Sequence, residues 1–414
     1  MHIHVRWALF GLLAVIFSSS ATLSQEWTRF RGPNGAGVSS ATTVPVKWSS
    51  DDYNWIAKLP GTGHSSPVVW GDKLFVTCCD DASATRVLLC LSTESGNVEW
   101  QKEIEFKSYK KHKNNSFASS TPCVDEKRIY VVWHSKESSP FMAFDHDGNE
   151  IWTHDLGPYL HGQGGATSPI VYNDLVVLAN DQKEPSFLLA VDRETGKERW
   201  KIPREGKRAC YATPCVYSTR ARQEELIFTH CYEGIIGVDP VTGKQTWHID
   251  VFGRESQRAL GSPVLADDLV IATSGAVGGD RQLVAVKPTG GDGNVTVSEA
   301  YRTTKQTPHV PSPLVYKDWL FLVSDQGIAS CLNKSTGNEI WKQRLGGNFF
   351  GSPVCVDGKI YCVDLDGKVS VFTASDDYEL LGRIELGEGS KASPAVSGGV
   401  LYLRTESQIF AIGG

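Results

Sequence analysis

The sequence predicts an all-β fold: an eight-bladed β-propeller with four-stranded blades, docking tryptophans and a split closing blade. Three observations lead to this prediction. A Ser-Pro or Thr-Pro dipeptide recurs at eight regularly spaced places along the 414 residues, the prolines of this series lie 40 to 55 residues apart, and a turn followed by a tryptophan recurs between them. A repeat of this length that holds four short strands is typical of a propeller blade.

Each dipeptide opens the same local pattern. A short apolar run follows the proline, a polar turn comes next, and a second apolar run completes a hairpin, as in "PVVWGDKLFVTCC". Proline at the first residue of a strand removes no hydrogen bond from the sheet, which favours this position. The dipeptides begin at Ser66, Thr121, Ser168, Thr213, Ser262, Ser312, Ser352 and Ser393.

A third strand in each unit leads through a Gly-containing turn to an aromatic residue. The glycine supplies the positive φ that a short hairpin loop needs. A tryptophan at a fixed place in each blade can fill the wedge between neighbouring blades, burying about 150–250 Å2. We therefore expect a structural docking role for Trp55, Trp100, Trp152, Trp200, Trp247 and Trp341. Unit five, "GDGNVTVSEAYR", lacks this tryptophan, and unit seven has Leu381 in its place.

The last unit is incomplete, because residues 388–414 supply three strands and the sequence then stops. The segment around Trp55 resembles the strand that ends unit six, so residues 48–60 are expected to complete this blade. Pairing the two ends of the chain in one blade closes the ring and removes open sheet edges. The propeller is therefore expected to span residues 48–414, after a leader of residues 25–47.

Residues 1–24 have the pattern of an export signal. Arg6 precedes an apolar run from Trp7 to Phe17, and small residues follow up to an expected cleavage point between Ala21 and Gln25. No later apolar run reaches the roughly 20 residues of a membrane span. We expect a monomeric protein without a membrane span, located in the periplasm or secreted.

Charge argues against nucleic acid as a partner. The net charge is −6, and Lys107–Lys113 is the one conspicuous basic cluster. A nucleic-acid-binding domain is usually basic over a whole face.

The ten cysteines and eleven histidines show no metal-binding spacing, and neither C-x-x-C nor C-x-x-C-H occurs. Most of the cysteines lie in strand-like runs, where a free thiol behaves as a small apolar residue. Cys78 and Cys79 form a possible vicinal pair. Two segments, Asp145–Glu150 and Asp364–Lys368, resemble calcium loops but lack the full ligand spacing, so we interpret them as hairpin turns.

Residues that precede each dipeptide should surround one mouth of the central channel, because the innermost strands begin there. Convergent polar groups in a concave site are the usual pattern of ligand binding, and several cations among them favour an anionic ligand. The candidates are His64, His161, Gln163, Arg208, Tyr211, Arg258, His309, Asn348 and Lys391, with Asn115, Phe117 and Phe349 beside them. The alternative is that these residues are simply hydrated ends of strands.

The repeat ends, such as the "AVDRETGKERW" of Ala190–Trp200, resemble the tryptophan-docking repeats of quinoprotein alcohol dehydrogenases. They are also similar to those of the outer-membrane assembly propeller and of other exported proteins with pyrroloquinoline-quinone-like repeats. The leader "EWTRFRGPNGAGVSS" resembles the segment that opens members of this superfamily. The resemblance covers nearly all of residues 26–414 and implies the propeller fold.

For activity, the resemblance leaves two hypotheses. In the dehydrogenases a quinone lies on a calcium ion over the propeller axis, with an Asp as base and a disulfide between adjacent cysteines against the cofactor. Cys78–Cys79 would match that disulfide, but the pair ends a second strand, and no residue here matches the calcium ligands or the Asp. We therefore favour a binding protein without cofactor or catalysis, whose ligand is a protein, peptide or polysaccharide. A simplified pyrroloquinoline-quinone-dependent alcohol or sugar dehydrogenase is the alternative.

Overall fold

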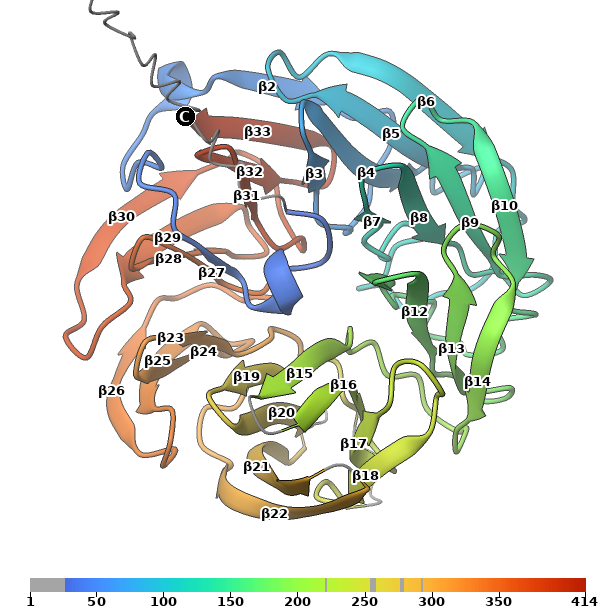
Figure 1. Ribbon diagram of the computed structural model, residues 1–414. Helices are drawn as coiled ribbons and strands as arrows, with labels where there is room; N and C mark the ends of the chain where they lie inside the picture. Colours follow the sequence, from blue (N-terminus) through green and yellow to red (C-terminus); the bar gives the residue numbers. More distant parts are fainter. Residues whose placement is uncertain (1–26, 220–221, 254–257, 276–278, 292) are drawn as a thin grey trace, which may run out of the picture.

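A computed structural model confirms the eight-bladed propeller with four-stranded blades (Figure 1). It describes residues 27–219, 222–253, 258–275, 279–291 and 293–414, so the predicted export signal lies outside the described residues. No helix among the described residues is long and apolar enough to cross a membrane.

The first four blades follow each other along the chain, and each is an antiparallel sheet whose first strand lies nearest the axis. Blade 1 contains β3 (Val68–Trp70), β4 (Lys73–Cys79), β5 (Arg86–Ser92) and β6 (Val98–Ile104). Blade 2 contains β7 (Cys123–Val124), β8 (Arg128–Val132), β9 (Pro140–Asp145) and β10 (Glu150–Asp155). Blade 3 contains β11 (Ile170–Tyr172), β12 (Leu175–Asn180), β13 (Phe187–Asp192) and β14 (Glu198–Pro203). Blade 4 contains β15 (Cys215–Thr219), β16 (Arg222–His230), β17 (Gly234–Val238) and β18 (Gln245–Ile249).

Blades 5 to 7 continue the same order. Blade 5 contains β19 (Val264–Ala266), β20 (Leu269–Gly275), β21 (Arg281–Gly291) and β22 (Asn294–Thr303). Blade 6 contains β23 (Leu314–Tyr316), β24 (Trp319–Val323), β25 (Ile328–Asn333) and β26 (Glu339–Arg344). Blade 7 contains β27 (Val354–Val356), β28 (Lys359–Val363), β29 (Lys368–Thr373) and β30 (Leu380–Glu385).

Blade 8 is split, as predicted. Its inner strands β31 (Ala395–Ser397), β32 (Val400–Arg404) and β33 (Gln408–Gly413) come from the C-terminal part of the chain, and β2 (Trp55–Lys58) is the outermost strand. Trp55 pairs with Ala411 and Lys58 with Gln408 in antiparallel register. A short 3-10 helix, η2 (Ser50–Asp52), precedes β2.

The hydrophobic core lies between blades, because successive residues of a strand point to opposite faces of the sheet. In β4, Val76 and Cys78 belong to the cluster shared by the leader and blades 7, 8 and 1. Phe75 and Cys79 point the other way, into the cluster between blades 1 and 2. Each blade is therefore covered on both faces by its neighbours.

Ser and Thr hydroxyls tie the blades together around the axis. At seven of the eight steps, the backbone N–H of the Ser or Thr before the proline donates to the hydroxyl of the corresponding residue in the next blade. The N···O distances are 2.8 to 3.1 Å, and Ser393 N–H closes the circle by donating to Ser66 Oγ. We call this set the hydroxyl ring.

The docking tryptophans link the outer parts of the blades. In five of them, the indole N–H donates to a backbone carbonyl in the next blade at 2.8 to 3.1 Å. In four of these the ring also lies against the turn glycine of that blade; the pairs are Trp55–Gly96, Trp100–Gly148, Trp152–Gly196 and Trp200–Gly243. The glycine therefore satisfies two needs, a positive φ and room for an indole ring.

Blade 5 keeps this contact with a different residue. The Tyr301 hydroxyl donates to the Lys334 carbonyl at 2.8 Å, and its ring lies against Gly337. Trp247, which faces the long β21–β22 hairpin, instead donates to the buried Glu225 carboxylate at 3.1 Å. The loss of tryptophan from unit five therefore does not interrupt docking.

We expect Gly243→Ala to destabilise the propeller more than Gly387→Ala. Both glycines have positive φ, 71° and 82°, but a Cβ at Gly243 would lie 2.7 Å from Trp200 Cγ, whereas nothing lies within 4 Å at Gly387. The control should lose about 1 kcal/mol from backbone strain, and Gly243→Ala about 1–3 kcal/mol more from overpacking. Urea unfolding of both variants measures the difference, and equal losses would contradict the docking role of the glycine.

Candidate functional site

The channel mouth holds a cavity of about 440 Å3 that residues of all eight blades line. The segment before each innermost strand reaches the mouth, since the hydroxyl ring fixes where those strands begin. The ring itself supplies part of the wall: Ser66, Thr121, Ser168, Thr213, Ser312, Ser352 and Ser393 all face the cavity.

Of the nine residues predicted for the mouth, the structure places six in the cavity wall: His64, Gln163, Tyr211, Arg258, His309 and Lys391. Asn115, named beside them, also lines the cavity. His161, Arg208 and Asn348 lie outside the wall, and His161 is buried.

The two phenylalanines named with this set are core residues instead. Phe117 packs between blades 1 and 2, and Phe349 packs between blades 6 and 7. It is Phe350 that lines the cavity, because neighbouring residues in an extended segment point in opposite directions.

Arg258 is a half-buried positive charge in the cavity wall. Its backbone bridges to Gly275, but its guanidinium has no ion-pair or hydrogen-bond partner among the described residues. Burial raises the pKa of Tyr211 and lowers the pKa of His161 and of His309, and the Arg258 charge opposes the shift at Tyr211 and adds to the shift at the two histidines. Arg258 is therefore available to an anion that enters the mouth.

His309 also offers unpaired groups to the cavity. It is 4% exposed, and neither Nδ1 nor Nε2 has a hydrogen-bond partner among the described residues. Its backbone is held in place, since the N–H groups of His309 and Val310 donate to the Asp325 carboxylate at 2.6 and 3.2 Å. Arg281 pairs with the same carboxylate at 2.9 Å. A buried imidazole without a partner is costly, and a ligand would remove that cost.

His64 and His309 of the cavity wall, and His161 outside it, are neutral at neutral pH. Burial lowers the pKa of His64 well below its usual value, lowers that of His161 to about 4, and lowers that of His309. The positive charge of the mouth therefore comes from Arg258 and Lys391, and the histidines act as hydrogen-bonding groups.

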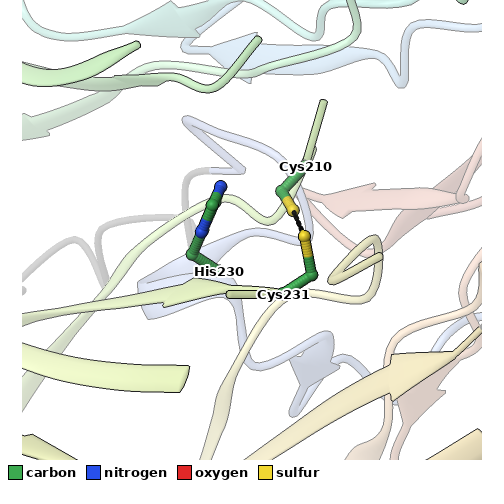
Figure 2. Close-up of side chains that lie close together, drawn as sticks. All are labelled: Cys210, His230 and Cys231. Carbon is green, nitrogen blue, oxygen red and sulfur yellow. Dashed lines mark hydrogen bonds between the residues drawn. The ribbon is translucent and has the colours of Figure 1, made fainter. Parts of the chain in front are cut away.

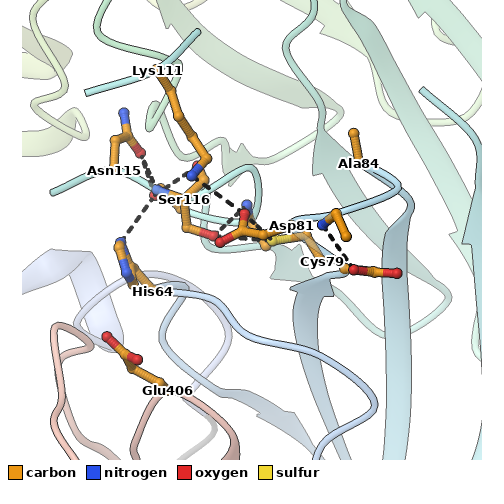
Figure 3. A network of polar contacts seen from close by, with 12 residues as sticks. His64, Cys79, Asp81, Ala84, Lys111, Asn115, Ser116 and Glu406 are labelled. Atoms are coloured by element: carbon orange, nitrogen blue, oxygen red, sulfur yellow. Dashed lines mark hydrogen bonds and ion pairs between the residues drawn. The ribbon is translucent and has the colours of Figure 1, made fainter. Parts of the chain in front are cut away.

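A polar network connects the cavity to the wall between blades 1 and 2 (Figure 3). Lys391 Nζ lies 3.2 Å from both His64 Nε2 and Glu406 Oε1, and Ser119 Oγ lies 3.5 Å from His64 Nδ1. Because Glu406 offsets its charge, Lys391 is a weaker anion ligand than Arg258.

The network ends at one of the two adjacent cysteines. Cys79 Sγ lies 3.2 Å from Ser116 Oγ, whereas Arg404 reaches Cys78 Sγ at 3.9 Å from the opposite side of β4. Both are free thiols, as are all ten cysteines, and neither lines the cavity. This arrangement differs from a disulfide laid against a ligand.

The leader closes the channel beneath the mouth, a role that the sequence did not reveal. Figure 1 shows its blue trace, with the short helix η1 (Pro33–Gly35), crossing the centre of the ring. Three backbone carbonyls of the leader accept hydrogen bonds from the innermost strands of blades 1, 2 and 7, in each case from the N–H of the second residue after the proline. The pairs are Trp27 with Val69, Thr28 with Val124 and Gly37 with Cys355. Strand β1 (Val38–Ser39) extends this contact by pairing in parallel with β27.

Side chains of the leader complete the closure. The Asn34 amide exchanges two hydrogen bonds with the backbone of Val216 in blade 4, at 2.8 and 2.7 Å. The buried Arg29 and Arg31 side chains donate to the carbonyls of Pro214 and Pro353. Phe30 lines the cavity and forms part of its floor. The mouth is therefore a closed cup rather than an open pore.

The cavity does not fit a quinone held on calcium. Among the described residues that line it, Asp325 is the one carboxylate, and Arg281 and two backbone N–H groups already engage it. Calcium takes six to eight oxygen ligands, with several carboxylates among them. The two loops that resemble calcium sites are turns. In each of them the first carboxylate, Asp145 or Asp364, accepts hydrogen bonds from the backbone N–H groups two and four residues later in the same turn.

We expect the free energy of unfolding to fall as pH drops from 7 to 5. His134 is buried against Tyr159, and burial lowers its pKa to about 3. In the unfolded chain this histidine has a pKa near 6.5 and is protonated at pH 5, whereas in the folded chain it stays neutral. This difference alone should lower the free energy of unfolding by about 2 kcal/mol at pH 5. In His134→Gln, the loss measured by denaturant unfolding at the two pH values should be smaller by this amount; an unchanged loss would contradict the assignment.

A family model described as "Outer membrane protein assembly factor BamB" matches residues 28–210 and 296–412, more than half of the chain. Among curated proteins, the chain matches the major capsid protein L1 of pygmy chimpanzee papillomavirus type 1, at 30% identity over 149 residues. That match covers 35% of this chain, and the chain spans about a quarter of the length of such relatives. It is too partial to carry an argument.

Solved structures are similar over nearly the whole chain. BamB from Moraxella catarrhalis is 16% identical with a TM-score of 0.60, covering 90% of this chain and 97% of that one. Quinohemoprotein alcohol dehydrogenase from Comamonas testosteroni is 12% identical with a TM-score of 0.69, covering 94% and 80%. At these identities the likeness shows the fold alone. By the match to the family model, the chain belongs to the BamB-like family of propellers with pyrroloquinoline-quinone-like repeats.

Proposed function

We propose that this chain is an exported binding protein that captures an acidic group of a partner protein or peptide in the cup at the channel mouth. The observation that carries the proposal is that Arg258 and the buried His309 line one cavity, and that within the described part of the chain neither the guanidinium nor the two imidazole nitrogens have a partner. A carboxylate would accept hydrogen bonds from both. Charge-assisted bonds of this kind are stronger than neutral ones.

The geometry of the cup suits a small group at the end of a longer chain. Its volume of about 440 Å3 lies in the range of small-molecule pockets, and the leader blocks passage through the channel. A side-chain carboxylate or a chain terminus can enter such a cup while the rest of the partner stays outside. The family description, an assembly factor for outer membrane proteins, supports a protein as the partner.

Export is part of this proposal and depends on the signal-like sequence of residues 1–24. We place the protein in the periplasm or outside the cell on that basis. The proposed function needs no cofactor, because the groups that would contact the ligand are all side chains of this chain.

We expect a fluorescently labelled tetraglutamate peptide to bind, and Arg258→Ala to weaken its affinity at least tenfold, as measured by fluorescence anisotropy. A tenfold loss corresponds to about 1.4 kcal/mol, in the range for removal of one partner of an ion pair. Arg258→Lys should keep most of the affinity, whereas His309→Gln should lose part of it. The melting temperature of the Arg258 variants should stay unchanged, since the guanidinium makes no bond to any residue that the structure describes.

The matched control is Arg302→Ala, which removes an arginine of the outer strand β22 that pairs with Glu299 at 2.6 Å, away from the cup. A tetraglutamine peptide controls for charge, and polygalacturonate added as a competitor tests an acidic polysaccharide. The proposal fails if Arg302→Ala and Arg258→Ala bind tetraglutamate equally, and polysaccharide binding without peptide binding would change the class of ligand.

The dehydrogenase alternative makes an opposite prediction. After incubation with pyrroloquinoline quinone and calcium followed by gel filtration, we expect no retained quinone absorbance and no alcohol-dependent reduction of a dye. The reason is that Asp325, the one carboxylate among the described lining residues, is already engaged. Retained quinone together with dye reduction that needs calcium would establish the dehydrogenase and overturn the non-catalytic proposal.

A further inference from the structure

Blade 4 brings together two cysteines and a histidine that are separated in the sequence. Cys210 lies in the segment before β15, whereas His230 ends β16 and Cys231 follows it. One ligand atom from each residue lies within 4.8 Å of the other two, and the three side chains are at most 1% exposed (Figure 2). Within the described part of the chain, no other cluster of potential metal ligands was found.

The separation of the two sulfurs suits a shared cation better than a disulfide. The sulfurs are 3.4 Å apart. Two thiolates on one tetrahedral cation, each with a bond of about 2.3 Å, lie about 3.8 Å apart, whereas the sulfurs of a disulfide lie about 2.05 Å apart. The thiols would move by a few tenths of an ångström to chelate a cation, and by more than an ångström to form a bond.

The histidine supplies an independent observation. His230 is fully buried, and its Nε2 has no hydrogen-bond partner among the described residues. Coordination through Nε2 would move the ring hydrogen to Nδ1, so the long 3.3 Å contact with the Tyr232 N–H would have to open.

The charges that face the cluster allow a cation. Arg204 approaches His230 and Cys231, but its positive charge is offset by Glu233 at 3.0 Å and Asp181 at 3.5 Å. Because Arg204 is already paired with these carboxylates, thiolates at Cys210 and Cys231 would need a separate positive partner, since buried anions are costly without one. Arg204 also lines a surface depression formed by residues 184–186 and 203–207.

We propose that Cys210, His230 and Cys231 bind a thiophilic d10 cation, Zn2+ or Cu+, that clamps the start of blade 4 to the end of its second strand. Binding replaces two thiol hydrogens by the cation and releases two protons. Zinc would take a water as its fourth ligand, whereas copper(I) is satisfied by three. Thiolate and imidazole ligands together select these metals over the hard cations Ca2+ and Mg2+.

The test uses the whole mature chain, purified without chelators and analysed for metal content. We expect one equivalent of zinc or copper in wild type, and at least a tenfold lower content in Cys210→Ala and Cys231→Ala. Cys331→Ala is the matched control, because Cys331 is equally buried in β25 of blade 6, and it should keep the metal. A chelator should lower the melting temperature of wild type and of the control, but not of Cys210→Ala.

A second measurement decides the matter where a variant does not fold. Metal-free wild type titrated with Co2+ under reducing conditions should develop the sulfur-to-cobalt charge-transfer band at one equivalent, and Zn2+ or Cu+ should displace it. The proposal is overturned if wild type neither retains a metal nor develops this band. It is also overturned if peptide mapping of fresh protein finds a Cys210–Cys231 disulfide. These outcomes do not depend on peptide binding at the mouth.

Discussion

The hydroxyl ring is the constraint on which the rest of the molecule depends. At seven of the eight steps, the N–H of the Ser or Thr donates to the hydroxyl of the corresponding residue in the next blade. The proline that follows has no N–H to compete and keeps the strand start extended. Since the last of these bonds joins Ser393 to Ser66, the ring fixes the closure of the propeller as well as the angle between blades.

The hydroxyl ring also determines which residues lie at each end of the channel. Residues before the prolines are held over the axis, where His64, Arg258 and His309 converge. Residues after the prolines form the inner edge strand of each blade. The leader hydrogen-bonds to the backbone N–H groups of this edge at Val69, Val124 and Cys355. The leader therefore satisfies backbone groups that a bare channel would leave to water, and the mouth becomes a cup as a result.

Local patterns in the sequence were sufficient for the fold. The spacing of the Ser/Thr-Pro dipeptides and the turn glycines predict eight blades, because each blade repeats the same local sequence pattern. The incomplete last unit and the strand-like segment around Trp55 predict the split closing blade. The structure goes further only where a contact crosses between blades. Tyr301 replaces a docking tryptophan, and the turn glycines make room for an indole ring from the preceding blade. Neither can be read from one repeat alone.

The site was less predictable, because it depends on side-chain direction and burial. The sequence locates the segments of the mouth, yet Phe350 rather than Phe349 lines the cavity, and His161, Arg208 and Asn348 lie outside its wall. Three histidines that look like cations in the sequence are neutral once buried. No spacing rule would join Cys210 to His230 and Cys231, since the hairpin β15–β16 brings them together.

The proposed cation site and the proposed cup meet at the junction of blades 4 and 5. Cys210 is followed directly by Tyr211, which lines the cavity and whose N–H donates to the Ala259 carbonyl at 3.1 Å. Ala259 is in turn the neighbour of Arg258. A cation that fixes Cys210 would therefore also fix the backbone that carries Tyr211 and steadies Arg258. Because ligands bind more tightly to groups that are held in place beforehand, the metal in this arrangement supports the cup without touching the ligand.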